Sequence, residues 1–194
     1  AEAQEVALGY AITLKSVDGI EPRVSLLKKQ IMEGLEGTDG AEMYALARRI
    51  VRACPARNDA CELGALFNWV QSNVRYTPDI VDRDTFQTAI RTVELGAGDC
   101  DDSTVLLSTL GAHLGFPMGA TVVAPPGEDW AHVYAQAAVP RENPQYAVAL
   151  DTTVDGAYPG WRPRGMERRK DFWFFAEDSE DYLRRRGRNI ARVG

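Results

Sequence analysis

The sequence predicts an α+β fold, with helices in the first half of the chain and an antiparallel sheet in the second. Apolar residues recur at helical spacing up to residue 77. Beyond residue 118 the chain consists of short segments rich in Val, Tyr and Thr, with Pro and Gly between them, which is typical of strands. Helices followed by strands differ from the alternating order of a βαβ protein. The 194 residues, 45% of them hydrophobic, suffice for one core, so we expect a single domain in residues 1–165 and a basic, aromatic extension in 166–194.

Three helices are expected before residue 77. Their apolar residues follow helical spacing in residues 24–35, 43–50 and 63–74. The stretch "YTPD" at 76–79 ends the third helix, because proline disfavours helix in the residue before it. We expect "RDTFQTAIRTVE", at 83–94, to form a loop with a short helix that leads to the glycines of "GAGDCDD".

A fourth helix and three strands complete the expected fold. The helix begins at "GDCDD", 98–102, and ends at Gly115 and Pro117, which are typical of helix ends. Its apolar stripe consists of Leu106, Leu107, Leu110 and Leu114. The expected strands are residues 119–124, 130–139 and 145–154.

Cys100 lies at the start of the fourth helix, where its neighbouring residues indicate a reactive thiol. The glycines at 96 and 98 allow a close backbone approach, and Asp99, Asp101 and Asp102 suit the N-cap and first turn. Backbone N–H groups at a helix N-terminus lower a thiol pKa and can hold an oxyanion. The carboxylates raise that pKa, so a thiolate needs a nearby imidazolium. The alternative is a small buried cysteine, against which the polar, glycine-flanked surroundings argue.

Two histidines are available as the base for a cysteine nucleophile. His113 lies thirteen residues further along the same helix, which at ~1.5 Å per residue places it about 20 Å from Cys100. It follows Leu106 and Leu110 on the apolar stripe, so we expect a structural role for it. His132, in "DWAHVYAQ", remains as the candidate base.

Asp151 is the candidate that orients the imidazole. A hairpin with "PRENP", 140–144, as its loop places His132 opposite Asp151, and directly opposed residues point to the same face of a sheet. Asp151 also follows an apolar run, where functional side chains often emerge from a strand. The alternatives are Asp155, four residues later, and Asp129, which is too near His132 in sequence to face it across a strand pair.

These residues resemble the transglutaminase-like superfamily of cysteine acyl-transfer enzymes, in its microbial and phage-encoded branch. The resemblance covers a core of residues 40–163 and is carried, in the family's order, by "ALFNWVQSNVRYTPD", "FQTAIRTVELGAGDCDDSTVLLSTLGAHLGFP", "WAHVYAQ", "VALDTTV" and "PGWRP". It implies a triad of Cys100, His132 and Asp151, and a papain-like core in which the cysteine helix packs against an antiparallel sheet. Many relatives have a tryptophan shortly before the Asp strand, where this chain has Tyr146, which leaves details of the substrate cleft open.

The resemblance implies cysteine-dependent acyl transfer at amide bonds through a thioester. Transfer to water makes the protein a peptidase or amidase acting on a protein or peptide, and transfer to an amine makes a crosslink. We expect hydrolysis. The alternative is a phage virion or assembly protein that uses this fold as a structural or binding module. Paired CxxC zinc ligands and an EF-hand loop are absent from the sequence, so we expect no metal and no cofactor.

Four further residues have open roles. Gln87, thirteen residues before Cys100, is a candidate oxyanion donor by loose analogy with papain-like enzymes, or a surface glutamine. Trp130 either lines the cleft or fills the core. Cys54 and Cys61 bracket a helix connection, where they form a disulfide in an oxidising compartment or serve as small core residues in the cytosol.

The charge distribution separates an acidic body from a basic end. The net charge is −6, yet from Arg162 onward ten basic residues outnumber six acidic ones. The acidic body argues against nucleic acid as a partner. The tail, with "DFWFF" at 171–175 and "RRRGRNIARVG" at 184–194, suits docking to a phage structural or host cell-wall partner, and a solvated helix end is the alternative.

The sequence gives no sign of membrane insertion. No apolar run approaches the ~20 residues that span a bilayer, and residues 1–15 lack the features of a signal peptide. We therefore expect a soluble protein without a membrane partner, either cytoplasmic or virion-associated, and the compartment stays open.

Overall fold

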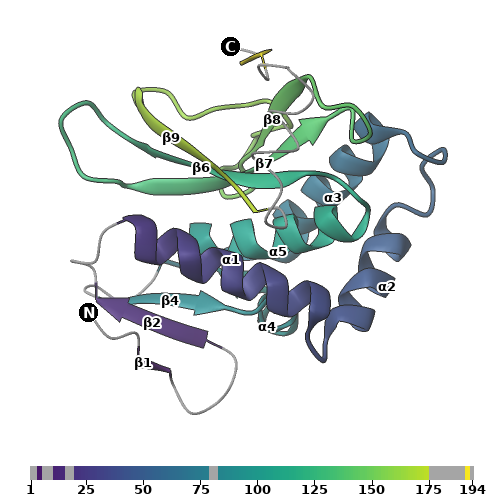
Figure 1. The fold of residues 1–194 in the computed structure, drawn as a ribbon, viewed down its shortest axis with the longest axis horizontal. Coiled ribbons are helices and arrows are strands. Elements are labelled where there is room, and N and C mark those ends of the chain that lie inside the picture. Colours follow the sequence, from purple (N-terminus) through teal and green to yellow (C-terminus); the bar gives the residue numbers. More distant parts are fainter. Residues whose placement is uncertain (1–3, 6–10, 16–19, 79–82, 175–190, 193–194) are drawn as a thin grey trace.

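The computed structural model describes residues 4–5, 11–15, 20–78, 83–174 and 191–192 (Figure 1). Within these ranges the helices are α1 (Ile20–Glu36), α2 (Gly40–Ile50), α3 (Asp59–Asn73), α4 (Ala89–Leu95) and α5 (Cys100–His113). In this part of the chain, none of the helices combines the length and the apolar character that crossing a membrane requires.

The strands form three sheets. The largest has the order β10-β8-β7-β6-β9 and contains β6 (Met118–Ala124), β7 (His132–Val139), β8 (Tyr146–Leu150), β9 (Arg168–Trp173) and β10 (Ala191–Arg192). Its strands pair antiparallel, except that β10 runs parallel to β8. A smaller sheet joins β1 (Gln4–Glu5), β2 (Ala11–Lys15) and β4 (Arg83–Gln87), and a short parallel pair joins β3 (Arg75–Tyr76) to β5 (Ala97–Gly98).

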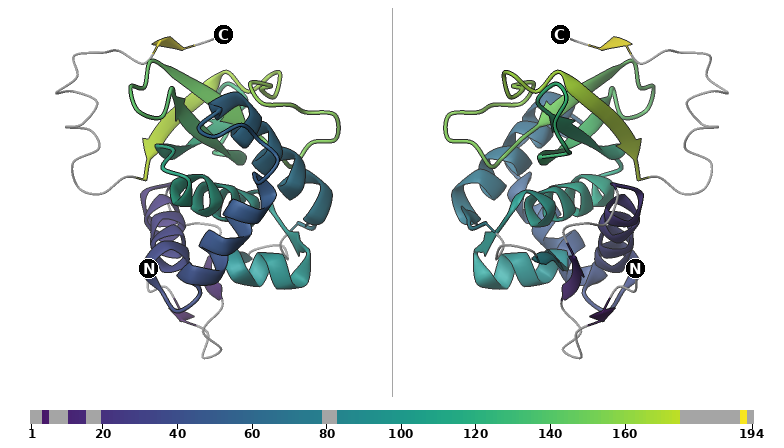
Figure 2. Two further views of the ribbon diagram at one scale, coloured as in Figure 1. Left: turned by 90° about the vertical axis from the view of Figure 1, so that its right-hand side faces the viewer. Right: turned by 90° about the vertical axis from the view of Figure 1, so that its left-hand side faces the viewer.

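Helix α5 occupies the centre of the molecule. It lies against β7 beneath the large sheet, with the other helices and β4 around its remaining sides (Figures 1 and 2). Every residue from Asp101 to Gly111 is buried. Three leucines of the predicted stripe, Leu106, Leu107 and Leu110, have no exposed surface, and burying each contributes about 1.5–3 kcal/mol to stability. A helix buried on all sides is a rigid support for a residue at its N-terminus.

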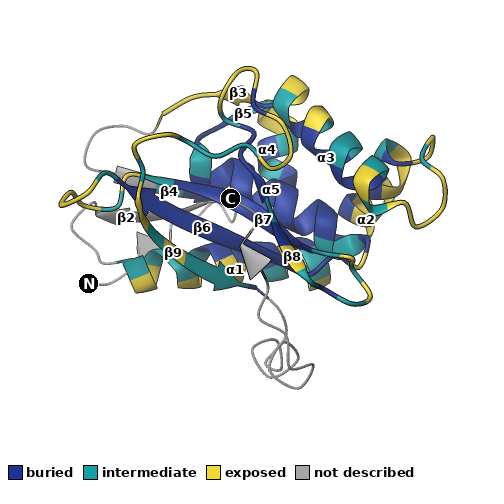
Figure 3. Ribbon diagram, turned by 90° about the horizontal axis from the view of Figure 1, so that it is seen from above, coloured by how far each residue is buried: buried dark blue, intermediate teal, exposed yellow. Residues whose placement is uncertain are grey.

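The large sheet is covered on both faces. Figure 3 shows β6 and β7 as almost entirely buried strands. One face packs on α5. On the other face Val123, Tyr134 and Ala149 form a small cluster, and Met166 from the connection between β8 and β9 packs against it. The connection therefore completes the second face of the sheet.

The predicted architecture is confirmed. The three expected helices correspond to α1, α2 and α3, the cysteine helix is α5, and the three expected strands are β6, β7 and β8. The predicted loop at 83–94 instead contains β4, followed by α4 as the short helix. Two details of the strands differ from the prediction.

The first difference is the register of the β7–β8 hairpin. Val139 pairs with Tyr146, two positions beyond Pro144, the partner that the predicted pairing of His132 with Asp151 requires. The loop is longer than predicted and runs from Pro140 to Gln145. A shift of two positions keeps every side chain on its predicted face, because side chains alternate with a period of two.

The second difference concerns the predicted extension in residues 166–194. Its residues Arg168–Trp173 form β9, which pairs antiparallel with β6 at the edge of the large sheet. This part of the extension therefore belongs to the sheet of the domain. Lysine and arginine are typical of edge strands, where they discourage pairing with other chains. The basic run at 184–190 lies outside the described residues.

Candidate active site

The start of α5 is fixed by a capping box. Asp99, the N-cap residue, accepts a hydrogen bond from the backbone N–H of Asp102 at 3.0 Å, and the Asp102 carboxylate accepts from the N–H of Asp99 at 3.2 Å. Gly98 packs on the same carboxylate side chain, because a Cβ there would lie 2.7 Å from the Cβ of Asp102. The glycine and the two aspartates therefore set the direction in which the chain enters α5.

Gln87 supports this helix start from β4. Its backbone N–H donates to Oδ1 of Asp102 at 2.8 Å, and its side-chain nitrogen donates to Oδ2 of Asp102 at 2.6 Å and to the carbonyl of Ala97 at 3.4 Å. The amide donors of Gln87 are thus directed at the helix start. The oxyanion role of Gln87 stays a prediction, and this geometry does not favour it.

Cys100 is the first residue of α5, and its side chain is half-buried. Its sulfur accepts a hydrogen bond from the backbone N–H of Val133, the residue that follows His132 on β7. Burial raises the pKa of the Cys100 thiol well above its ordinary value, and the charges of Asp101 and Asp99 raise it further. The Val133 hydrogen bond and the charge of Arg23 act in the opposite direction but do not outweigh these effects. The resting thiol is therefore protonated near neutral pH.

His132 and Asp151 form a short hydrogen bond. Nε2 of His132 lies 2.7 Å from Oδ2 of Asp151, whose residue is only 1% exposed. The other carboxylate oxygen accepts hydrogen bonds from the backbone N–H and the hydroxyl of Thr153, at 3.1 and 2.7 Å. Because Nε2 contacts Asp151, the ring nitrogen left for a reacting group is Nδ1.

The pKa of Asp151 lies below its ordinary value. Burial alone would raise this pKa, but the hydrogen bond and charge of His132, together with the two hydrogen bonds from Thr153, outweigh that effect. Asp151 is therefore ionised at neutral pH and can stabilise a positive charge on the imidazole.

The hairpin register explains why these two side chains meet. Ala135 pairs with Leu150, so Asp151 immediately follows the last paired residue of β8. His132 and Asp151 are thus diagonal neighbours rather than directly opposed residues, and both point to one face of the sheet. Within the described residues, neither Asp155 nor Asp129, the two alternative carboxylates, forms a hydrogen bond or ion pair with His132.

Tyr76 also belongs to this region, and the sequence analysis did not single it out. It lies in β3, where it pairs with Gly98, two residues before Cys100. The backbone N–H of Thr77 donates to the Gly98 carbonyl at 2.9 Å, and the Tyr76 side chain is half exposed. Burial raises the pKa of Tyr76, and the charges of Cys100, Asp99, Asp101 and Asp151 raise it further. Its hydroxyl is therefore neutral near pH 7, and its backbone lies beside Gly98, two residues before the candidate nucleophile.

Trp130 and His113 occupy different environments. Trp130, two residues before His132, packs against the main core, and the guanidinium of Arg168 lies 4.2 Å from its ring centroid. His113 lies at the opposite end of α5, where Nε2 is 2.9 Å from the carbonyl of Gly34 and the ring meets Tyr44 edge-on. These contacts place His113 in the packing between α5, α1 and α2, as its position on the stripe predicted.

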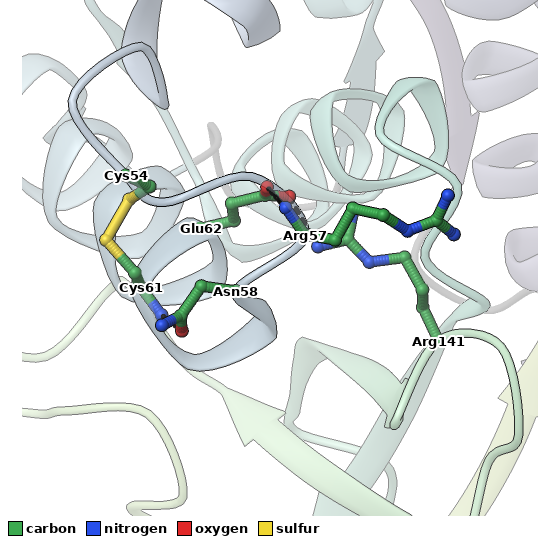
Figure 4. Close-up of a disulfide and its surroundings, with 6 residues drawn as sticks. All are labelled: Cys54, Arg57, Asn58, Cys61, Glu62 and Arg141. Atoms are coloured by element: carbon green, nitrogen blue, oxygen red, sulfur yellow. Dashed lines mark hydrogen bonds and ion pairs between the residues drawn. A yellow bond between two sulfur atoms is a disulfide. The ribbon is translucent and has the colours of Figure 1, made fainter.

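Cys54 and Cys61 form a disulfide with a Cα–Cα distance of 5.7 Å (Figure 4). It joins the turn after α2 to the first turn of α3. Asn58, between them, caps α3 by accepting the N–H of Cys61 at 3.0 Å. The two alternatives for this pair are thus resolved in favour of the disulfide, and Cys100 is the remaining free thiol.

One group of described residues offers ligand atoms to a metal ion. The atoms of Asp99, Cys100 and Asp101 all lie within 4.8 Å of one another. Two carboxylates and one thiol are a poor set for calcium, which takes six to eight oxygen ligands. Asp99 is also committed to the capping box, and Asp101 lies 3.9 Å from the guanidinium of Arg23. The arrangement suits a thiol at a helix N-terminus better than a metal centre.

Comparison with known proteins gives one family and several structural likenesses. The profile of the transglutaminase-like superfamily matches residues 44–147. A search of the curated proteins finds no significant sequence match. Legionella pneumophila LapG is similar in structure, with a TM-score of 0.51 at 14% identity, over 87% of this chain and 97% of LapG. Its calcium-bound form gives the same TM-score at 12% identity, over 87% of this chain and 99% of LapG.

Other likenesses involve longer proteins. The chain covers 32% of a proposed protease from Parabacteroides distasonis, at 12% identity and a TM-score of 0.47 over 73% of this chain. It covers 58% of a proposed cysteine protease from Cytophaga hutchinsonii, at 16% identity and a TM-score of 0.48 over 84% of this chain. At these identities the LapG likeness concerns the fold alone, and it agrees with the papain-like arrangement of helix and sheet predicted from the sequence.

Proposed function

The chain belongs to the transglutaminase-like superfamily, and we propose that it is a cysteine-dependent enzyme that cleaves amide bonds of a protein or peptide and transfers the acyl group to water. The observation that carries the proposal is the 2.7 Å hydrogen bond between His132 and Asp151. It forms at the start of β7, where the backbone N–H of the next residue, Val133, interacts with the Cys100 sulfur. The proposal assigns Cys100 as the nucleophile, His132 as the base and Asp151 as the group that orients the base.

Acylation follows from this arrangement. Nδ1 of His132 takes the thiol proton while the sulfur of Cys100 attacks the carbonyl carbon, and the carbonyl electron pair moves onto oxygen. The oxyanion lies near the N-terminus of α5, where backbone N–H groups without helical partners can stabilise it. The pair then returns to reform the carbonyl, the C–N bond breaks, and His132 delivers its proton to the leaving amine.

Deacylation reverses the roles. His132 removes a proton from water, the oxygen attacks the thioester carbon, and the C–S bond breaks to release the acid and the thiol. Asp151 keeps Nε2–H of the imidazole directed away from the sulfur throughout and stabilises the positive charge on the ring. The raised pKa of Cys100 fits this scheme, because a thiol that is neutral at rest requires a base during the attack.

The test is hydrolysis of a casein-derived peptide mixture by the full chain and by Cys100→Ala and His132→Ala. We expect both variants to lose essentially all turnover while circular dichroism reports an unchanged fold. His113→Ala is the control, since this histidine lies at the far end of α5. Full activity of a folded His132→Ala protein would overturn the proposal.

The acyl acceptor is decided by adding a fluorescent primary amine to the same reaction. Products that carry only a new carboxylate support hydrolysis, and amine incorporated into the peptide supports crosslinking. The alternative phage virion or assembly role stays a prediction. It gains support if the wild-type chain is folded, turns over no amide and still binds one component of a virion preparation.

A further inference from the structure

We infer that a cavity at the end of α5 opposite Cys100 binds a small oxyanion with two or more negative charges, such as a phosphate ester or a polycarboxylate. The cavity has a volume of about 430 Å³. Four arginines line it, Arg48, Arg52, Arg57 and Arg141, against one carboxylate, that of Glu62. This binding function is separate from the proposed amide cleavage.

Two of the four arginines pair with carboxylates of the protein. Arg141 contacts Oδ1 of Asp59 at 2.7 Å, Oε2 of Glu62 at 2.5 Å and the carbonyl of Leu114 at 2.8 Å. The Arg57 side chain forms an ion pair with Glu142, and its backbone N–H donates to Glu62 at 3.1 Å. Figure 4 shows both arginines beside Glu62. The contacts of Arg141 hold its guanidinium at the cavity without requiring a ligand, whereas the Arg57–Glu142 ion pair is exposed to solvent.

The other two arginines form a cationic pair. Arg48 lies in the last turn of α2 and Arg52 in the turn that follows the helix, and both line the cavity. Among the described residues, no carboxylate forms an ion pair with either of them. Two like charges that line one cavity repel each other. A bound anion would remove this repulsion, and a guanidinium fork matches the oxygens of phosphate or carboxylate.

The size and place of the cavity narrow the choice of ligand. Its volume falls in the range of small-molecule sites, which is larger than one inorganic ion requires. Leu114, which follows α5, lines it, so the cavity lies roughly 20 Å from Cys100 at ~1.5 Å per helical residue. A ligand there would not contact the candidate active site, so binding and amide cleavage can be measured independently.

The experiment is titration calorimetry of the full chain with pyrophosphate and, separately, with citrate at constant ionic strength. The variants are Arg48→Gln/Arg52→Gln and the control Arg49→Gln, which removes a charge from the same helix but does not line the cavity. Charge-assisted hydrogen bonds of about 1.5–3 kcal/mol predict that the double variant loses at least about tenfold in affinity while the control is unchanged.

The two titrants distinguish the source of the anion. Tighter binding of pyrophosphate assigns the site to phosphate esters, and tighter binding of citrate assigns it to polycarboxylates. The absence of saturable binding for both, or equal weakening by Arg49→Gln and the double variant, overturns the inference. The titration is repeated with Cys100→Ala, which should bind the anion with the affinity of the wild type. Anion binding is thereby tested separately from amide cleavage.

Discussion

At the level of single residues, the protonation of Cys100 is open to direct measurement. Burial and two carboxylates raise its pKa, so alkylation by iodoacetamide should be slow near pH 7 and accelerate as the pH rises beyond the ordinary thiol range of about 8.5. Asp101→Asn removes one of the causes and should increase the rate at a given pH. Cys100→Ala is the labelling control. A rate that does not change between neutral and alkaline pH would indicate a preformed thiolate instead.

Asp151→Asn tests the role of the carboxylate while His132, the candidate base, stays in place. The variant keeps the side-chain size but lacks the charge that stabilises the imidazolium, so turnover should fall by about 10²–10⁴-fold without disappearing. The measurement is kcat for peptide hydrolysis, with circular dichroism as the folding control. Activity equal to wild type would show that His132 works without a carboxylate partner.

The same carboxylate contributes to stability in a defined pH range. Because its folded pKa is lowered, this contribution is complete above the unfolded value of about 3.9 and is lost as the pH falls through the folded pKa. Urea denaturation of wild type and Asp151→Asn should therefore converge on acidification below about pH 4. A difference that stayed constant with pH would contradict the lowered pKa.

At the level of elements, the start of α5 depends on one buried side chain. Asp102 accepts the backbone N–H of Asp99 and both the backbone and side-chain N–H of Gln87. Asp102→Ala leaves these donors without an acceptor and should lower the free energy of unfolding by about 2–4 kcal/mol. Asp102→Asn keeps one acceptor oxygen and should lose less. Urea denaturation of both variants makes the comparison, and equal losses would assign the effect to packing rather than hydrogen bonding.

Two glycines in helices test the packing of α1 on α5. A Cβ at Gly34 would lie 2.7 Å from Cγ2 of Thr109, so Gly34→Ala should destabilise the protein by about 1–3 kcal/mol although alanine favours helix. Gly64 in α3 has no atom within 4 Å of the same position. Gly64→Ala should therefore stabilise by about 0.5–1 kcal/mol. Thermal unfolding measures both, and the same sign for the two variants would refute the contrast.

The elements that the sequence predicted are those with strong local signals. Helix α5 combines an N-cap aspartate, a leucine stripe and a terminal glycine, and all three act within the helix. The β7–β8 register depends instead on how the loop at 140–145 closes, which hydrophobic alternation does not determine. Strand β9 was assigned to an extension because its charged residues resemble a solvated tail, although such residues also suit an edge strand.

In the candidate site, too, the sequence predicts residues with local signals and misses those that depend on the packing of distant segments. Cys100, His132 and Asp151 could be proposed from the sequence because Cys100 begins a helix with a strong local signal, and His132 and Asp151 are brought together by one hairpin. Tyr76 could not, since it reaches this region only through parallel pairing of two short segments far apart in the sequence, β3 and β5. The sequence indicates Gln87 as a candidate, but the direction of its side-chain amide toward Asp102 depends on where β4 lies against α5.

At the scale of the whole molecule, the Cys54–Cys61 disulfide connects the turn after α2 to the first turn of α3. It spans a sequence separation of seven residues, and loop-closure entropy for so short a loop corresponds to about 2–3 kcal/mol of stability. The double variant Cys54→Ser/Cys61→Ser should unfold at correspondingly lower urea concentration. Its hydrolytic activity at low urea should be unchanged, because the disulfide lies at the opposite end of α5. A stability equal to wild type would mean that the helix contacts alone fix this connection.

Helix α5 also separates the free thiol of Cys100 from the Cys54–Cys61 disulfide. Cys100 begins the helix, whereas Cys54 and the residue that follows the helix line the same cavity, roughly 20 Å away at ~1.5 Å per residue. Thiol–disulfide exchange requires contact between sulfur atoms, so the folded chain cannot scramble its own pairing. The two ends nevertheless respond oppositely to the same reagent: dithiothreitol protects the thiol at one end and opens the bridge at the other. Purification without reductant therefore preserves the bridge, whereas reduction before an assay protects the Cys100 thiol and can open the bridge.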